Sequence, residues 1–263
     1  MAYAKVKYAR EGAVAIITLN DPATLNAADP AMADEISQAM TQAVSEARAV
    51  VLTGEGRGFS SGAKLGASGA PPMAEDGKID LGQALDKHYN PLVTQLRDLP
   101  IPFVTAVNGA AAGVGCSIAL MGDLIVAGES AYFLQAFRRI GLVPDGGSTY
   151  LLSRMVGRAR AMEMMLLGEK LPAAKALDWG LVNRVVPDAD LMPTALALAS
   201  ELAAGPTKTL AMIRRLAWQS EDAAWQAQLT AERVAQREAG RTEDFAEGVK
   251  AFLTKRPANF SGS

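Results

Sequence analysis

One carboxylate stands out as a candidate acid or base. Asp145 lies in the segment VPDGG at residues 143–147. A carboxylate in an apolar pocket has a raised pKa and can accept and return a proton near neutral pH. A Pro-Asp-Gly sequence is also common in simple turns, so these residues alone leave both interpretations open. The neighbouring residues are mostly apolar, as a proton-transfer role requires: Phe133, Phe137, Ile140, Leu142 and Val143.

Two glycine-rich turns could supply backbone N–H groups to a ligand. The apolar residues 50–53 precede GEGRGFSSGAKL at 54–65, and the apolar residues 103–107 precede NGAAAGVG at 108–115. Short β-branched runs of this kind predict buried strands. A glycine-rich bend that leads into a helix leaves N–H groups without acceptors, and two of them can hold one carbonyl oxygen as it gains negative charge. Each bend is equally compatible with an ordinary tight turn.

Taken together, FSSGAKL and NGAAAGVG resemble the enoyl-CoA hydratase/isomerase (crotonase) superfamily, and the resemblance extends from Val14 to Phe260. It implies an α/β fold with a crotonase-like ββα spiral core at residues 1–204 and a C-terminal helical trimerisation region at 205–263. It also implies an acyl-CoA thioester substrate whose carbonyl oxygen is bound in an oxyanion hole. By position, the oxyanion donors would be the N–H groups of Ala63 and Val114.

Two positions bear on the type of reaction. Hydratases of the superfamily carry two glutamates, and this sequence has Ser117 and Phe137 at those positions. Neither residue is an acid or base at neutral pH. Several isomerases place an Asp where this chain has Asp145, so the resemblance implies a single acid/base. Ser117, Phe137 and Leu142 are expected in the substrate pocket. The resemblance assigns three residues to coenzyme A binding: Ala27, Lys64 and Leu65.

A closer resemblance is to the 1,2-epoxyphenylacetyl-CoA isomerase-like members of the superfamily. It rests on residues 134–168, on Tyr89-Asn90-Pro91 and on residues 239–262. It implies conversion of a ring epoxide to an oxepin, a shift of 3-enoyl to 2-enoyl double bonds, or both. No cofactor is expected, because coenzyme A is part of the substrate. Two alternatives stay open: an enoyl-CoA hydratase of fatty-acid or aromatic-acid degradation, and a non-catalytic acyl-CoA-binding subunit.

Other chemistries fit the sequence less well. A related dehalogenase class uses a helical histidine that would fall near Asn90, whereas the one histidine is His88. Residues 58–62 match the G-x-S-x-G pattern of serine hydrolases, but no histidine follows late in the chain. The sequence contains no Cys/His cluster with metal-ligand spacing.

The composition excludes several partner classes. The 263 residues carry a formal net charge of -2, so there is no broad basic field for nucleic acid or an anionic membrane. The single cysteine, Cys116, excludes an intrachain disulfide. No apolar run is long enough for a membrane helix. We therefore expect a cytoplasmic protein, and the resemblance implies a homotrimer or a dimer of trimers.

Strand and helix patterns alternate along the first 204 residues, which predicts α/β layering. Asp29-Pro30 is typical of a helix start, with Asp as N-cap and Pro at the first position. A hairpin is expected at residues 6–20. Further strands are expected at 49–53, 103–107, 124–127, 131–133 and 181–186. Helices are expected at 80–98, 148–155, 158–167, 188–203, 223–239 and 243–253.

Overall fold

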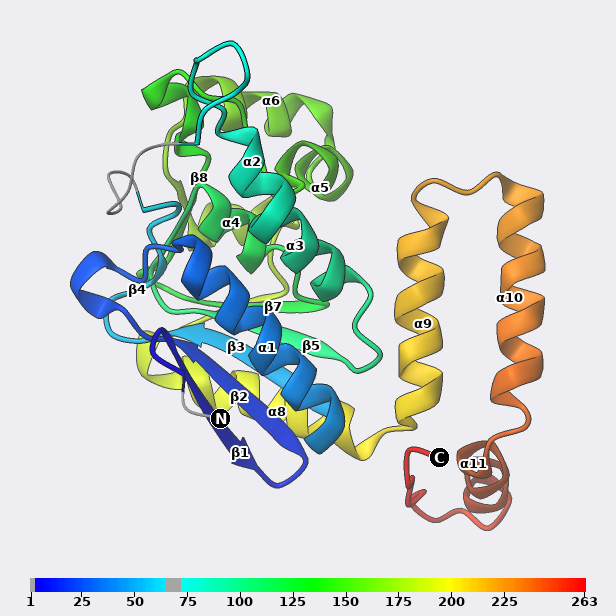
Figure 1. Cartoon of the computed structure of the whole chain (residues 1–263). Helices are drawn as coiled ribbons and strands as arrows, with labels where there is room; N and C mark the ends of the chain where they lie inside the picture. The colour runs from blue at the N-terminus through cyan, green and yellow to red at the C-terminus, as the bar shows by residue number, and fades with distance from the viewer. Residues whose placement is uncertain (1–2, 65–71) are drawn as a thin grey trace.

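The computed structural model describes residues 3–64 and 72–263, and its core is built on a six-stranded sheet (Figure 1). The strand order is β1-β2-β3-β5-β7-β10, parallel except for the β1–β2 hairpin. All residues of β3 and β5 are buried, because helices cover both faces of the sheet. The strands are β1 (Val6–Glu11), β2 (Val14–Leu19), β3 (Ala49–Gly54), β5 (Phe103–Val107), β7 (Leu124–Gly128) and β10 (Arg184–Val186).

A second sheet of very short strands continues the first one. Strands β3, β5 and β7 are each followed by a three-residue strand, β4, β6 and β8, and these three pair in that order, with the two-residue strand β9 added antiparallel to β8. The repeated strand–strand–helix unit gives the spiral core that the sequence predicted. The short strands are β4 (Gly58–Ser60), β6 (Ala110–Ala112), β8 (Tyr132–Leu134) and β9 (Leu171–Pro172).

The turns of this spiral stack at van der Waals distance. A Cβ atom built on Gly109 would lie 2.2 Å from the Arg57 carbonyl oxygen, so only glycine fits where the chain leaves β5. The side-chain amide of Asn108 then donates to the carbonyls of Gly54 and Gly56, at 2.8 Å each. Successive repeats are therefore held in register close to the two glycine-rich turns.

Helices pack on both faces of the six-stranded sheet. Helix α1 begins as predicted, with the Asp29 carboxylate accepting from Met32 N at 2.9 Å. It packs against β2 and β3, while α8 packs against β3 and β5. The core helices are α1 (Pro30–Glu46), α2 (Gly82–Ala84), α3 (Asn90–Arg97), α4 (Val114–Ala119), α5 (Ser148–Met155), α6 (Gly157–Leu167), α7 (Ala173–Asp178) and α8 (Leu191–Ala204).

Three details differ from the sequence-based expectation. The helix expected at 80–98 contains a π-helical segment, Leu85–Tyr89, between α2 and α3. The last strand is shorter than the expected 181–186. The short strands β4, β6 and β9 and the helix α7 were not expected. Each difference arises where contacts distant in sequence, or one extra residue in a helical turn, decide the local structure.

Three further helices extend away from the core (Figure 1). They are α9 (Thr207–Ser220), α10 (Trp225–Ala239) and α11 (Glu243–Leu253). Arg214 on α9 is buried against the core, where it donates to Asp123 Oδ2 at 2.5 Å and to the Leu96 carbonyl at 3.1 Å. Arg48, just after α1, donates to the carbonyls of Gly205 and Phe260. These two arginines fasten the C-terminal helices to the core.

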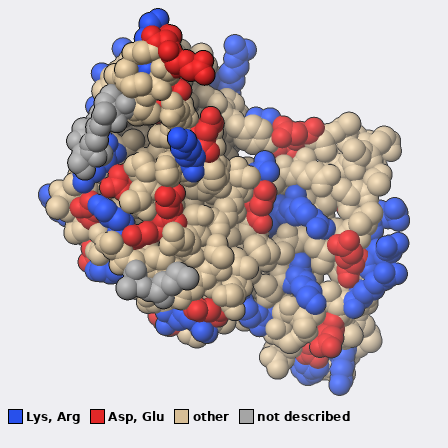
Figure 2. All heavy atoms as spheres, viewed as in Figure 1, with Lys and Arg blue, Asp and Glu red and all other residues tan. Residues whose placement is uncertain are grey.

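The surface carries charges of both signs. Figure 2 shows Lys and Arg interspersed with Asp and Glu over the core and the C-terminal helices. Within the described part of the chain, no helix is both long enough and apolar enough to span a membrane.

Candidate active site

The two glycine-rich turns meet at the ends of β4 and β6. These strands are parallel neighbours, with Gly58 opposite Ala110. A Cβ atom on Gly113 would lie only 3.7 Å from Gly62 Cα, so the turns are in contact. Among the residues that the structure describes, neither the N–H of Ala63 nor that of Val114 has a hydrogen-bond acceptor. Two N–H groups without acceptors thus lie on contacting turns, as an oxyanion site requires.

Glycine is required at one of these turns by backbone conformation and by space. Gly62 has a φ of +97°, and a Cβ there would lie 2.8 Å from the Ala112 carbonyl oxygen. Both conditions exclude an L side chain without displacement of the turn. Gly62 therefore allows the tight bend, and the next residue, Ala63, is exposed.

Asp145 lies in the loop before α5, and this loop packs directly on α4. A Cβ on Gly146 would lie 2.9 Å from Ser117 Cβ and 3.3 Å from Val114 Cγ2. The hydroxyl of Ser117 donates to the backbone carbonyl of Asp145 at 2.9 Å, and Ser148 N donates to the same oxygen at 3.1 Å. The loop that carries Asp145 thus lies against the Ser117 and Val114 side chains of α4.

The side chain of Asp145 is half-buried, and one of its carboxylate oxygens lacks a compensating hydrogen bond among the described residues. Its Oδ1 atom is buried and has no hydrogen-bond partner among the described residues. Burial raises the pKa of Asp145 from 3.8 to about 6. An unpartnered buried carboxylate costs folding free energy, so its presence calls for a reason other than stability. The group is poised to exchange a proton near neutral pH.

The predicted pocket residues lie around this centre. Phe137 is almost fully buried, and its ring approaches within 3.8 Å of a Cβ built on Gly113, next to the oxyanion turn. Leu142 is 38 % exposed at the start of the Asp145 loop. Ser117 is fully buried, and its hydroxyl is engaged with Asp145 O and with Ser148 Oγ at 2.6 Å. Contact of these three side chains with substrate stays a prediction.

The residues expected to bind coenzyme A are placed in part. Ala27 is buried next to Ala28, which forms a parallel bridge with Ala63. Lys64 is half-exposed, with Nζ 3.8 Å from Asp21 Oδ2. Leu65 lies outside the described residues. Ala27 and Lys64 thus flank the Ala63 donor, and their role in binding stays a prediction.

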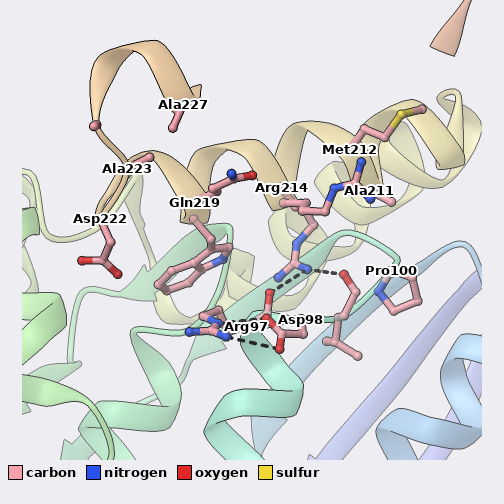
Figure 3. A pocket seen from close by; sticks show the side chains of 14 residues that line it. Arg97, Asp98, Pro100, Ala211, Met212, Arg214, Gln219, Asp222, Ala223 and Ala227 are labelled. Atoms are coloured by element: carbon pink, nitrogen blue, oxygen red, sulfur yellow. Dashed lines mark hydrogen bonds and ion pairs between the residues drawn. The ribbon is translucent and has the colours of Figure 1, made fainter. Parts of the chain in front are cut away.

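A large cleft of about 840 Å³ lies elsewhere, between α9 and residues 97–100 (Figure 3). Figure 3 shows Arg214 reaching across it toward the core, beside the Arg97–Asp98 ion pair. None of the predicted site residues lines this cleft. Asp145 and the two N–H groups without acceptors are the candidate active site on chemical grounds, and they lie outside this cleft.

A buried tyrosine whose role the sequence did not indicate lies next to this candidate site. Tyr89 is buried, and its hydroxyl donates to the Ala28 carbonyl at 2.7 Å. Burial, followed by the charges of Asp29 and Asp145, raises the pKa of Tyr89 to about 12. The only signal in the sequence was the resemblance of Tyr89-Asn90-Pro91 to one group of isomerases.

Two backbone N–H groups without acceptors on contacting turns, and a half-buried carboxylate in the loop packed against one of these turns, form a candidate site for proton transfer next to a carbonyl group. Comparison with known proteins agrees with this class. The family model described as "Enoyl-CoA hydratase/isomerase" matches residues 9–263. The chain belongs to the enoyl-CoA hydratase/isomerase family, and its fold is the expected crotonase-like spiral.

The names of individual relatives describe different activities, some an isomerase and others a hydratase. The 1,2-epoxyphenylacetyl-CoA isomerase of Escherichia coli is 43 % identical over 254 residues, which cover 96 % of each chain. A "Probable enoyl-CoA hydratase" of Rhodobacter capsulatus is also 43 % identical, over 262 residues and all of both chains. The crystal structure of an enoyl-CoA hydratase from Polaromonas sp. JS666 has a TM-score of 0.88 at 33 % identity, covering 97 % of this chain and 99 % of that one.

Proposed function

We propose that this protein is an acyl-CoA isomerase with Asp145 as its single acid/base. The proposed reactions are the shift of a 3-enoyl-CoA to a 2-enoyl-CoA and the rearrangement of 1,2-epoxyphenylacetyl-CoA to its oxepin form. The observation that carries the proposal is the Oδ1 atom of Asp145, which is buried without a hydrogen-bond partner among the described residues, in the loop whose Gly146 packs on Val114.

In the proposed mechanism, the N–H groups of Ala63 and Val114 donate to the thioester oxygen. The Asp145 carboxylate removes a proton from the α carbon of a 3-enoyl-CoA, and the resulting negative charge is stabilised on that oxygen. Asp145 then returns the proton to the γ carbon, which leaves the double bond conjugated with the thioester. With an epoxide substrate, Asp145 would assist the ring rearrangement.

The packing around Ser117 supports an isomerase rather than a hydratase. Ser117 occupies one of the two hydratase glutamate positions, and its hydroxyl is hydrogen-bonded to the Asp145 loop. Gly146 packs against the same side chain, so a glutamate there would displace the loop. The second position holds an apolar ring, Phe137. A hydratase is the second candidate, because the R. capsulatus relative carries that name at equal identity.

The first prediction concerns Asp145→Asn. With a 3-enoyl-CoA, wild type should produce the conjugated 2-enoyl-CoA, measured by its ultraviolet absorbance, and the variant should lose about 10²-fold or more in kcat, because positioned proton transfer contributes that much. Binding of the acyl-CoA should persist. Asp178→Asn is the control, since Asp178 is exposed at the end of α7.

Each alternative has a distinct outcome in this experiment. Equal turnover by Asp145→Asn and wild type would refute the role of Asp145. Consumption of a 2-enoyl-CoA by wild type, with loss of conjugation, would establish a hydratase. If neither an enoyl-CoA nor the ring-epoxide substrate were turned over while acyl-CoA still bound, the protein would be the non-catalytic subunit.

We further propose that the protein is a homotrimer or a dimer of trimers. Large apolar side chains on the C-terminal helices are exposed in the single chain, including Trp225 at 72 % and Phe252 at 83 %. Faces of this kind are typical of interfaces. Sedimentation equilibrium should give three or six times the mass of one chain. The mass of a single chain at micromolar concentration would contradict the proposal.

A further inference from the structure

We infer that Tyr89 is a positioning residue that aims the N–H of Ala63 at the substrate oxygen. This inference rests on the proposed function, because it concerns the oxyanion site of the same reaction. It accounts for a buried phenol that the proton-transfer mechanism does not use.

The first step is a short chain of hydrogen bonds. The Tyr89 hydroxyl donates to the Ala28 carbonyl at 2.7 Å, and Ala28 N donates to the Gly62 carbonyl at 2.8 Å. Gly62 C=O and Ala63 N–H belong to one planar trans peptide unit, so they point in opposite directions. Because Ala28 holds the carbonyl side of this unit, it also fixes the direction of the free N–H on the other side.

The second step is the position of this link within the donor loop. Upstream residues of the loop have their own anchors, since Ser60 Oγ donates to the Asn26 carbonyl and Ser61 N donates to the Leu25 carbonyl. The Ala28 bridge is the last pairing before the Ala63 donor. The hydrogen bond from Tyr89 to the Ala28 carbonyl links this last pairing to the helical segment that leads into α3.

The third step is how Tyr89 reaches Ala28. Residues Leu85–Tyr89 form a π-helical turn, with Asn90 N donating to the Leu85 carbonyl five residues earlier. The additional residue changes the helical phase, and Tyr89 is buried at 5 % exposure while Asn90 is exposed. Single π-turns inside helices occur frequently at functional sites. An uninterrupted α-helix would present the following side chains on a different face.

The fourth step is the protonation of the phenol. Burial raises the pKa of Tyr89 to about 12, and the carboxylates of Asp29, Asp145 and Asp34 contribute in the same direction. At neutral pH the hydroxyl therefore keeps its proton and acts as a donor. The hydroxyl donates its proton to the hydrogen bond with the Ala28 carbonyl. Tyr89 therefore acts on the donor loop through the backbone of Ala28 and not as a second acid.

The test is Tyr89→Phe, which removes the hydroxyl and keeps the ring. We expect kcat for the 3-enoyl-CoA to fall about fivefold to tenfold, the effect of one hydrogen bond, with KM changed less than twofold. Tyr3→Phe is the matched control, because the Tyr3 hydroxyl donates to Gln42 Oε1 at 2.8 Å and ties the N-terminal segment to α1. The control should keep kcat and show the same small change in unfolding temperature.

A second measurement is independent of turnover. A bound conjugated enoyl-CoA absorbs at longer wavelength when its thioester oxygen accepts hydrogen bonds, and we expect this shift to be smaller in Tyr89→Phe than in wild type or Tyr3→Phe. If wild type binds the ligand but isomerises nothing, the proposed function fails while the spectral shift still tests Tyr89. Wild-type kcat and an unchanged band in Tyr89→Phe would overturn the inference. The inference would also be overturned if the loss of kcat in Tyr89→Phe were accompanied by a corresponding fall in unfolding temperature and a raised KM.

Discussion

At the scale of a single residue, the role proposed for Asp145 implies a pH range in which the site can work. Its pKa is raised to about 6 because burial disfavours the charged form. Below that pH the carboxyl is protonated and cannot remove a proton from substrate. Above it the carboxylate is charged and free to act as a base, since its Oδ1 has no partner among the described residues.

We therefore predict that kcat/KM for a 3-enoyl-CoA rises tenfold per pH unit up to pH about 6 and is level above it. The residual kcat/KM of Asp145→Asn should not show this rise with pH. A profile that is flat between pH 5 and pH 8 in wild type would contradict the assignment.

The stability of the fold should also depend on the ionisation of Asp145, but it should fall with rising pH where the activity rises. The folded-state pKa lies above the unfolded value, so the native state binds this proton more tightly, and the stabilisation is lost as pH rises through about 6. Asp145→Asn should therefore unfold at a higher temperature than wild type at pH 8, and this difference should vanish below pH about 4.

At the scale of elements, the contact between the Asp145 loop and α4 can be isolated with two glycines. Gly146 and Gly12 have nearly equal φ angles of +58° and +57°, but only Gly146 has neighbours within 4 Å of a Cβ position. Replacement by Ala should cost about 1–2 kcal/mol at either site from the left-handed backbone. Gly146→Ala should cost about 1–3 kcal/mol more from overpacking on Ser117 and Val114.

Denaturant unfolding measures these free energies, and turnover of a 3-enoyl-CoA distinguishes the variants further. Gly12→Ala should keep wild-type kcat, because the β1–β2 turn is remote from the site in sequence and packing. Gly146→Ala should lose activity as the loop moves. Equal stability and equal kcat in the two variants would show that the loop does not depend on this contact.

The elements that the sequence predicted are those with local signals. The hairpin, the capped start of α1 and the apolar runs of β3 and β5 each depend on residues close in the chain. The two donor turns and Asp145 were likewise predicted from glycine-rich motifs and the family resemblance. Strand β9 was not, because its two residues become a strand only by pairing with β8. The π-turn also escaped prediction, since one additional residue in a helix leaves no pattern of its own.

At the scale of the whole molecule, the C-terminal helices depend on a buried ion pair. Arg214 donates to Asp123 at 2.5 Å and to the carbonyls of Leu96 and Arg97 at the end of α3. Arg214→Met should cost about 3–5 kcal/mol, because it leaves the Asp123 charge buried without its partner. Its sequence neighbour Arg215 pairs with Glu238 at 3.3 Å on the surface, so Arg215→Met should cost less than about 1 kcal/mol.

Chemical denaturation of the two variants measures this difference. A loss of stability confined to Arg214→Met would assign the attachment of α9 to the buried pair. Similar small losses in both variants would show instead that the apolar contacts of α9 suffice.

The single thiol has a consequence for how the site's motions can be followed. Cys116 is fully buried in α4, two residues after the Val114 donor, and burial raises the pKa of its thiol to about 12. A thiol reagent can reach it only when α4 opens, so the rate of labelling reports that opening directly. The labelling rate of Cys116 therefore measures local unfolding of α4. A bound acyl-CoA that stabilises the closed form of α4 should lower this rate.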